Sequence, residues 1–75
     1  MNTIDIGRLV SQRREYLNLN QQDVAELAEV TTRTIYKIEK GKGNPAIQTL
    51  QQIFDVLGLE INISIKKNLD ERAGL

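Results

Sequence analysis

Residues 20–41 contain the pattern that most restricts how this chain can fold. Small and apolar residues recur there at helical spacing on both sides of a short break: Val24, Ala25 and Ala28 before it, Ile35 and Ile38 after it. This period indicates two short helices, each with a single apolar face. The small side chain of Ala25 lets the first helix approach the second closely. The segment therefore predicts two packed helices joined by a tight turn.

The second of these helices has a polar face opposite its apolar one. That face holds hydroxyl and cationic side chains: Thr32, Arg33, Tyr36, Lys37 and Lys40. Such groups can contact the phosphates and base edges of duplex DNA, and a helix-turn-helix places its second helix in the major groove. Arg33 is the strongest candidate for reading a base, because the bidentate arginine–guanine contact is the commonest specific one.

Contacts to the DNA backbone are expected around this helix. Gln21 and Thr31 stand at helix N-termini, where they can donate to phosphate; capping and solvation are the alternative. The hydroxyl of Tyr36 could reach a phosphate, or its ring could pack over Lys40. Polar side chains at the helix end and in the following loop are placed to meet the sugar-phosphate backbone: Lys40, Lys42 and Asn44.

The expected helices have recognisable ends. The first runs from Ile6 to Leu17 with Asp5 as its N-cap. The second begins at Gln21 after the cap residue Asn20. The third follows a Thr31 cap and reaches Lys40, where Gly41 ends it. Pro45 suits the first turn of a fourth helix, which ends at Gly58. That helix has one apolar stripe, formed by Ile47, Leu50, Ile53, Phe54 and Leu57.

The hydrophobic period changes after the fourth helix. Three isoleucines alternate with polar residues in the stretch EINISIK, residues 60–66: Ile61, Ile63 and Ile65. Strict alternation is typical of a β-strand. A lone strand leaves its backbone groups unpaired, and no other segment of the chain alternates, so the partner strand is expected from a second molecule. The three isoleucines would then form a homodimer interface. A fraying tail with incidental alternation is the alternative.

The composition argues against several classes of protein. The 75 residues include no Cys and no His. Disulfides, common metal-ligand clusters and activated nucleophiles therefore have little support, and neither an enzyme nor a cofactor is expected. No apolar run approaches the ~20 residues of a membrane span, and the first residues lack the apolar centre of a signal peptide. We therefore expect a cytoplasmic protein with no membrane partner.

Charge is distributed unevenly along the chain. Ten basic and ten acidic residues cancel overall, whereas DNA-binding domains are often basic. Residues 31–44, however, contain Arg33 and three lysines against the single acid Glu39. The predicted DNA-facing region is thus basic within a neutral chain. Neutrality predicts weak non-specific DNA binding, because that binding comes from phosphate neutralisation.

The chain resembles a known family through a specific set of residues: Gln21, Ala25, Thr31, Ile35, Ile38, Glu39 and Gly41. These look like the XRE/Cro–CI helix-turn-helix family of bacterial and phage regulators. The similarity extends from about Leu9 to Leu59. Glu29 departs from the pattern, because the family usually has Gly at this turn position. If the turn needs a positive φ there, a non-glycine residue costs ~1 kcal/mol.

The resemblance implies a mainly α, lambda-repressor-like domain of four helices, to which the C-terminal strand adds pairing across a dimer. It implies that Thr32, Arg33 and Lys37 are base-facing, and that Arg14 and Glu39 form a structural ion pair between the first and third helices. The implied function is a sequence-specific transcriptional regulator that binds a palindromic operator as a homodimer. We expect it to repress by occluding a promoter, although activation uses the same fold. The gene could be chromosomal or carried by a phage or plasmid.

A second functional hypothesis comes from the alternating segment. A helix-turn-helix followed by such a strand resembles the HipB-like antitoxins, which bind a toxin protein as well as DNA. Under either hypothesis the organisation is the same. Residues 1–59 form the DNA-binding domain, residues 60–67 the dimerisation strand, and residues 68–75 a polar tail expected to fray.

Overall fold

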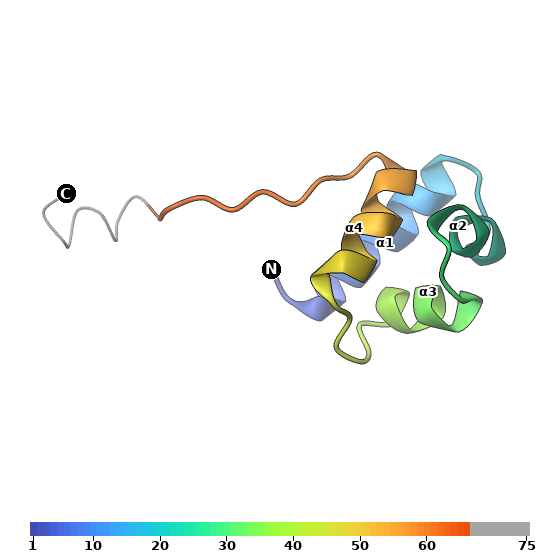
Figure 1. The fold of residues 1–75 in the computed structure, drawn as a ribbon, viewed down its shortest axis with the longest axis horizontal. Helices are drawn as coiled ribbons and strands as arrows, with labels where there is room; N and C mark the ends of the chain where they lie inside the picture. Colours follow the sequence, from blue (N-terminus) through green and yellow to red (C-terminus); the bar gives the residue numbers. More distant parts are fainter. Residues whose placement is uncertain (67–75) are drawn as a thin grey trace, which may run out of the picture.

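Four helices follow one another in the computed structural model, which describes residues 1–66: α1 (Thr3–Tyr16), α2 (Gln21–Ala28), α3 (Thr32–Glu39) and α4 (Ile47–Leu57). α2 and α3 are joined by a short turn, while α1 and α4 pack together beside them (Figure 1). The expected four-helix, mainly α architecture is therefore confirmed. Within residues 1–66, no helix is both long and apolar enough to span a membrane.

The first helix begins earlier than the sequence analysis predicted. Asn2, not Asp5, is the N-cap of α1: its side chain accepts the Asp5 N–H at 2.9 Å, and the Asp5 carboxylate accepts the Asn2 N–H at 3.3 Å. This reciprocal capping box satisfies two otherwise unpaired N–H donors. It therefore favours a helix that begins at Thr3 over one that begins at Ile6. Asp5 instead lies in the first helical turn. The predicted cap of α2 at Asn20 is confirmed, again as a capping box, with Asp23.

The hydrophobic core is formed by one face of each helix. Its members are buried side chains from all four: Val10 from α1; Val24, Ala25 and Ala28 from α2; Ile35 and Ile38 from α3; Leu50, Ile53, Phe54 and Leu57 from α4. Ala25 lies where α2 meets its neighbours, as its small size predicted. Ile47 is an exception to the predicted stripe, because it is 65% exposed at the start of α4.

α1 and α3 cross at Gly7, where the backbones approach closely. A Cβ added there would lie against the Ile38 carbonyl oxygen and 2.8 Å from that of Glu39. Gly7 is buried, and no larger residue fits without moving one of the two helices. The end of α3 is thus held directly against α1, which sets the position of the helix expected to read DNA.

The ends of α4 also differ in part from expectation. Ala46 is the N-cap and Pro45 lies before it, so the proline precedes the helix and is not in its first turn. The helix ends as predicted at Gly58, which has a φ of 71° in the left-handed region that glycine tolerates. Arg13 on α1 caps this end, because its Nε donates to the Leu57 carbonyl oxygen at 2.7 Å.

Beyond Leu59 the chain leaves the helical body. Residues 60–66 run outward as an extended stretch (Figure 1) and have no β-ladder partner within residues 1–66. Ile63 is 93% exposed and Ile65 76%, whereas Ile61, nearer the body, is 39% exposed. Strand formation across a dimer therefore remains a prediction. Residue 67 of the predicted strand and the predicted tail, 68–75, lie outside the described residues.

Candidate nucleic-acid interface

Glu29 stands in the turn between α2 and α3, at the position where the family usually has glycine. Glu29 adopts φ 58° and ψ 42°, a left-handed conformation in a residue that has a Cβ. The turn is closed by a hydrogen bond from the Val30 N–H to the Ala25 carbonyl oxygen at 2.9 Å. The chain thus makes the tight turn without glycine, at a strain of about 1–2 kcal/mol.

Thr31 starts the third helix as predicted. Its Oγ1 accepts the Thr34 N–H at 3.2 Å and lies 3.0 Å from Thr34 Oγ1. The hydroxyl therefore caps the helix. Capping was the predicted alternative to a phosphate contact for Thr31. Thr31 remains exposed, so the free N–H groups of the first turn of α3 are still accessible to an anion.

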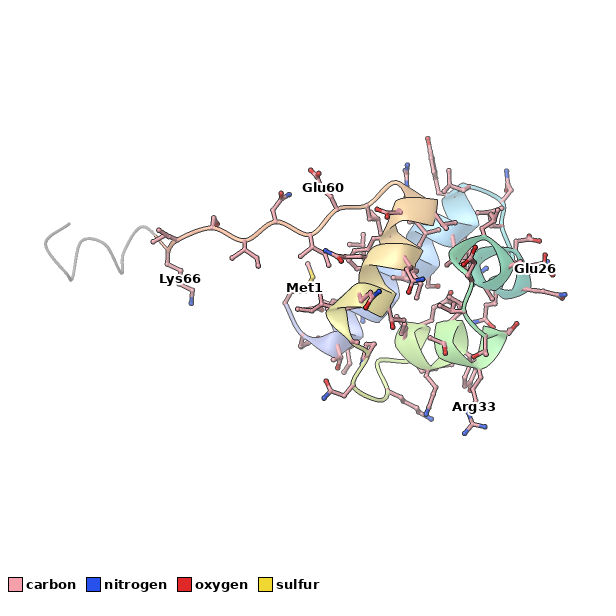
Figure 2. All side chains as sticks on the ribbon, viewed as in Figure 1. Met1, Glu26, Arg33, Glu60 and Lys66 are labelled. Carbon is pink, nitrogen blue, oxygen red and sulfur yellow. The ribbon has the colours of Figure 1, made fainter. Side chains whose placement is uncertain are left out.

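α3 separates its residues into a buried and an exposed face. Ile35 and Ile38 are 0% and 4% exposed and attach the helix to the core. The predicted DNA-contacting residues of this helix and its cap are all exposed: Thr32, Arg33, Tyr36, Lys37 and Lys40. Figure 2 shows the Arg33 side chain extending from α3 into solvent, away from the helical body. The described chain thus presents a free, basic helix face about two turns long.

Tyr36 and Lys40 interact on this face. The Lys40 Nζ lies 5.7 Å from the centroid of the Tyr36 ring, within the range of a cation–π contact. Tyr36 is still 44% exposed. Of the two arrangements considered for Tyr36, the structure contains packing against Lys40, and the phenol is still accessible at the surface.

The loop after α3 folds back on the end of the helix. The Lys42 N–H donates to the Lys37 carbonyl oxygen at 2.9 Å, and Gly41 has a φ of 69°. This brings both lysines to one open hollow of about 170 Å³, whose other walls include Thr34, Asn44, Ile38 and Pro45. Sequence reasoning passed over Thr34, although it lies one helical turn before Lys37. Groups that donate hydrogen bonds therefore converge beside α3.

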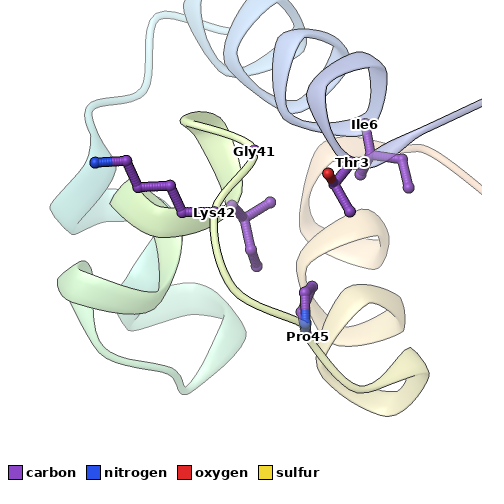
Figure 3. Close-up of a pocket in the computed structure, with 6 residues that line it drawn as sticks. Thr3, Ile6, Gly41, Lys42 and Pro45 are labelled. Atoms are coloured by element: carbon purple, nitrogen blue, oxygen red, sulfur yellow. The ribbon is translucent and has the colours of Figure 1, made fainter.

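A smaller hollow lies behind the same loop. It has room for about 10 Å³, and Figure 3 shows Thr3 and Ile6 of α1 facing Pro45 across it. The Lys42 side chain points away from this hollow (Figure 3). Such a volume holds at most one water molecule. It is therefore a packing gap between α1 and the loop, while the Lys42 ammonium is directed toward solvent.

Arg14 and Glu39 lie together between α1 and α3. Arg14 Nε and Nη2 donate to the two Glu39 carboxylate oxygens at 2.7 and 3.0 Å, and Nη1 donates to the Leu19 carbonyl oxygen at 2.9 Å. The two side chains are only 14% and 7% exposed. The hydrogen bond to Glu39 raises the pKa of the Arg14 guanidinium above its ordinary value, against the opposing effect of desolvation. The Arg14 guanidinium is therefore held in its charged form, in a bidentate geometry with Glu39.

Gln21 joins this network from the start of α2. Its Nε2 donates to Glu39 Oε1 at 3.2 Å. The amide has two N–H groups, so one is engaged by Glu39 and the other is available for a phosphate. Gln21 was predicted as a DNA contact, whereas its hydrogen bond to Glu39 was not predicted from the sequence. The network links the N-terminus of α2 to the C-terminus of α3, the two ends that would flank a bound duplex.

Comparison with known proteins places this geometry in a family. The helix-turn-helix family model matches residues 10–63. The HTH-type transcriptional regulator PuuR of Escherichia coli is 39% identical over 56 residues, which is 75% of this chain and 30% of that protein. A putative HTH-type transcriptional regulatory protein of Methanothermobacter thermautotrophicus is 36% identical over 59 residues, covering 79% of this chain and 19% of that protein.

A shorter relative matches along most of its length. An uncharacterised HTH-type transcriptional regulator of Sinorhizobium fredii, y4mF, is 39% identical over 59 residues, which is 79% of this chain and 78% of the relative. By contrast, the chain spans only 30% of the length of PuuR and 19% of the length of the Methanothermobacter protein. The shared region contains α2, the turn and α3, and these relatives are named as transcriptional regulators. The chain therefore belongs to the XRE-type helix-turn-helix family.

Proposed function

We propose that this protein is a sequence-specific DNA-binding transcriptional regulator that reads the major groove with α3. The observation that supports this most is the division of α3 into a face anchored by Ile35 and Ile38 and a free basic face. In the proposed complex Thr32, Arg33 and Lys37 face the bases. The sugar-phosphate backbone is contacted by residues around them: Gln21, Thr31, Tyr36, Lys40, Lys42 and Asn44.

A local excess of positive charge on α3 and the loop after it supports DNA binding at this face. The basic residues of α3 and its loop would release counterions from a few phosphates, so affinity should fall with rising salt. The chain as a whole is neutral, which weakens attraction to DNA of any sequence. A regulator of this kind depends more on base contacts than on total charge, and its preference for an operator over random DNA should be correspondingly clear.

We further propose that two copies bind a palindromic operator and repress by occluding a promoter. Pairing of residues 60–66 across a two-fold axis would hold two recognition helices one turn of DNA apart, ~34 Å. The exposure of Ile63 and Ile65 supports this proposal, because two large apolar side chains in water favour a partner. Two-fold symmetry makes the paired strands antiparallel.

Selection of bound sequences from a random DNA pool by the purified protein tests the proposal. We expect enrichment of an inverted repeat whose half-site centres are 10–10.5 base pairs apart. Enrichment of a single half-site would retain DNA reading by α3 but contradict dimeric binding. Recovery of random sequence would contradict the proposed function as a whole.

The antitoxin alternative rests on the same exposed isoleucines, which could equally cover an apolar surface of a toxin protein. The discriminating experiment is co-purification of the tagged protein with the product of the neighbouring reading frame, followed by an activity assay of that product. A stable, inhibited complex that is lost in an Ile63→Asp variant would favour the antitoxin. Absence of a complex, together with an enriched inverted repeat, would leave a regulator without a toxin partner.

A further inference from the structure

The described residues include an apolar groove that no part of residues 1–66 fills. It lies between α1, α4 and the start of the C-terminal stretch and has a volume of about 390 Å³. Most of its walls are hydrophobic, including Met1, Leu9, Ile47, Leu50, Phe54 and Leu59. Ile47 is 65% exposed and Leu9 37%. We call this hollow the α1–α4 groove. It lies away from α3, so DNA bound by that helix would not cover it.

The extended stretch of the same chain carries apolar side chains that nothing else in residues 1–66 buries. Ile61 lines the groove, and Ile63 and Ile65 follow on the same face of the extended stretch. At ~3.3 Å per residue, Ile65 lies ~13 Å beyond Ile61, and the stretch runs away from the helices (Figure 1). Ile63 and Ile65 therefore cannot enter their own groove unless the chain reverses within a few residues.

We propose that the α1–α4 groove receives the Ile65 side chain of a second copy of this chain. The inference rests on the dimer proposed above and extends it from the strands to the helical body. In an antiparallel pair centred on Ile63, Ile63 meets its symmetry mate and Ile61 lies opposite Ile65 of the second copy. Directly opposite side chains on one face are ~4.5–5.5 Å apart at Cβ. Because Ile61 lines the groove, together with its neighbours Glu60 and Asn62, the opposing Ile65 would lie beside the groove too.

Two-fold symmetry makes this arrangement reciprocal and closed. Each copy supplies one groove and one projecting Ile65, so both grooves are filled and no apolar end is left to recruit a third chain. The interface then has three parts: the strand pair, the central isoleucines and the two filled grooves. Contact of each Ile65 with the other copy's α1 and α4 also fixes the orientation of the helical bodies, which strands alone would leave free to twist.

Site-directed cross-linking tests the proposal, because the chain has no cysteine of its own. A Leu9→Cys chain is mixed with an Ile65→Cys chain and treated with a short bismaleimide, without DNA. We expect a covalent heterodimer, identified by mass. The matched control mixes Glu26→Cys with Ile65→Cys. Glu26 is an exposed α2 residue on the side of the body away from the stretch (Figure 2), and no heterodimer is expected.

Other outcomes distinguish failure of groove filling by Ile65 from failure of the dimer itself. If Ile63→Cys cross-links to itself but Leu9→Cys and Ile65→Cys do not join, the strand dimer stands and filling of the groove is wrong. If a Leu9→Cys/Ile65→Cys double variant cross-links only within one chain at high dilution, the groove is filled by its own stretch and the inference is overturned. If none of these pairs reacts, the dimer itself is wrong, whatever DNA selection shows.

A substitution provides a second readout that does not depend on cross-linking. Ile65→Asp should weaken dimerisation at least about ten-fold, because a side chain proposed to be buried becomes charged. Ser64→Asp adds the same charge on the opposite face of the strand and should change dimerisation much less. Sedimentation measures both variants. Equal effects of the two would overturn burial of Ile65, and circular dichroism checks that the helices remain folded.

Discussion

The helical body and the C-terminal stretch deal with apolar side chains in opposite ways. In the body, Val10, Ile35, Ile53 and Leu57 are each 0% exposed, because helices related by short connections can turn their apolar faces toward one another. In the stretch, Ile63 is 93% exposed. Within residues 1–66 the stretch has no partner strand for its backbone hydrogen bonds and no surface that buries Ile63 or Ile65. The comparison teaches that the body buries its own apolar side chains, whereas the stretch leaves Ile63 and Ile65 in solvent, and a partner for the stretch is what we propose.

The comparison predicts that changes in the stretch affect assembly without unfolding the body. Ile63→Asp should abolish the dimer, because it removes the two isoleucine side chains proposed to be buried against each other, about 3–6 kcal/mol in sum, and brings two carboxylates together at the symmetry axis. Sedimentation should show monomers, and operator affinity should fall steeply. Circular dichroism should be unchanged, since Ile63 makes little contact with the helices. A wild-type chain that is already monomeric at tens of micromolar would break the comparison.

Changes within the part-buried Arg14–Glu39 ion pair should have the reverse effect, on stability and not on assembly. Glu39→Ala strands the Arg14 guanidinium in a site where it is 14% exposed, and should lower the free energy of unfolding by about 3–5 kcal/mol. Arg14→Ala should also destabilise the fold, because it leaves the Glu39 carboxylate without its cation. The double variant should lose less than the sum of the two, because neither charge is then left alone.

Chemical denaturation of the four proteins of this double-mutant cycle measures the coupling. Additive losses would contradict the bidentate contact. The cycle also reports on Gln21, whose amide shares Glu39. In the Arg14→Ala variant Gln21 remains as a partner of Glu39, so the two single variants need not lose equal amounts.

On the side of the body proposed to face DNA, Arg33→Ala should affect function and leave both folding and assembly intact. Arg33 is exposed on α3, so stability should change by less than ~0.5 kcal/mol. Operator affinity should fall by ~1–3 kcal/mol with relaxed preference at one base pair in each half-site. Competition binding with single-base operator variants measures this. Unchanged base preference would show that Arg33 does not read a base.

Lys42→Ala is the matched comparison for Arg33→Ala. Lys42 lies in the loop after α3, is exposed, and points away from the hollow behind that loop (Figure 3). Its loss should weaken all sequences about equally and reduce the slope of log affinity against log salt by ~1. A change in base preference in the Lys42 variant would mean that the two roles have been assigned the wrong way round.

The smallest expected effect is a gain in stability at the turn. Glu29→Gly should raise the free energy of unfolding by up to ~1.5 kcal/mol: it relieves left-handed strain of ~1–2 kcal/mol, while the greater backbone entropy of glycine in the unfolded chain costs ~0.5–1 kcal/mol. Thermal or chemical denaturation would detect it. A Glu29→Ala variant is the control, because it removes the charge but keeps the Cβ and the strain. Stabilisation of both variants alike would assign the effect to charge.

Much of the fold was predictable because its signals are local. The caps at Asn20 and Thr31, the stop at Gly58 and the apolar periods of α2 and α3 each depend on residues within about one or two helical turns. The exposed basic face of α3 follows from the same periodicity. The start of α1 was mispredicted even though its signal is local, because Asn2 and Asp5 form a reciprocal capping box that starts the helix before the first apolar residues.

The sequence by itself determined which segments are helical, which face of each is apolar, and that residues 60–66 have the alternation of a strand. Only the tertiary structure decided which distant residues meet: Gly7 against the end of α3, Gln21 with Glu39 eighteen residues away, and Arg13 with the Leu57 carbonyl forty-four residues away. It also showed the α1–α4 groove. Periodicity and capping act over a few residues, whereas these contacts depend on how whole helices cross, and no local pattern in the chain encodes that.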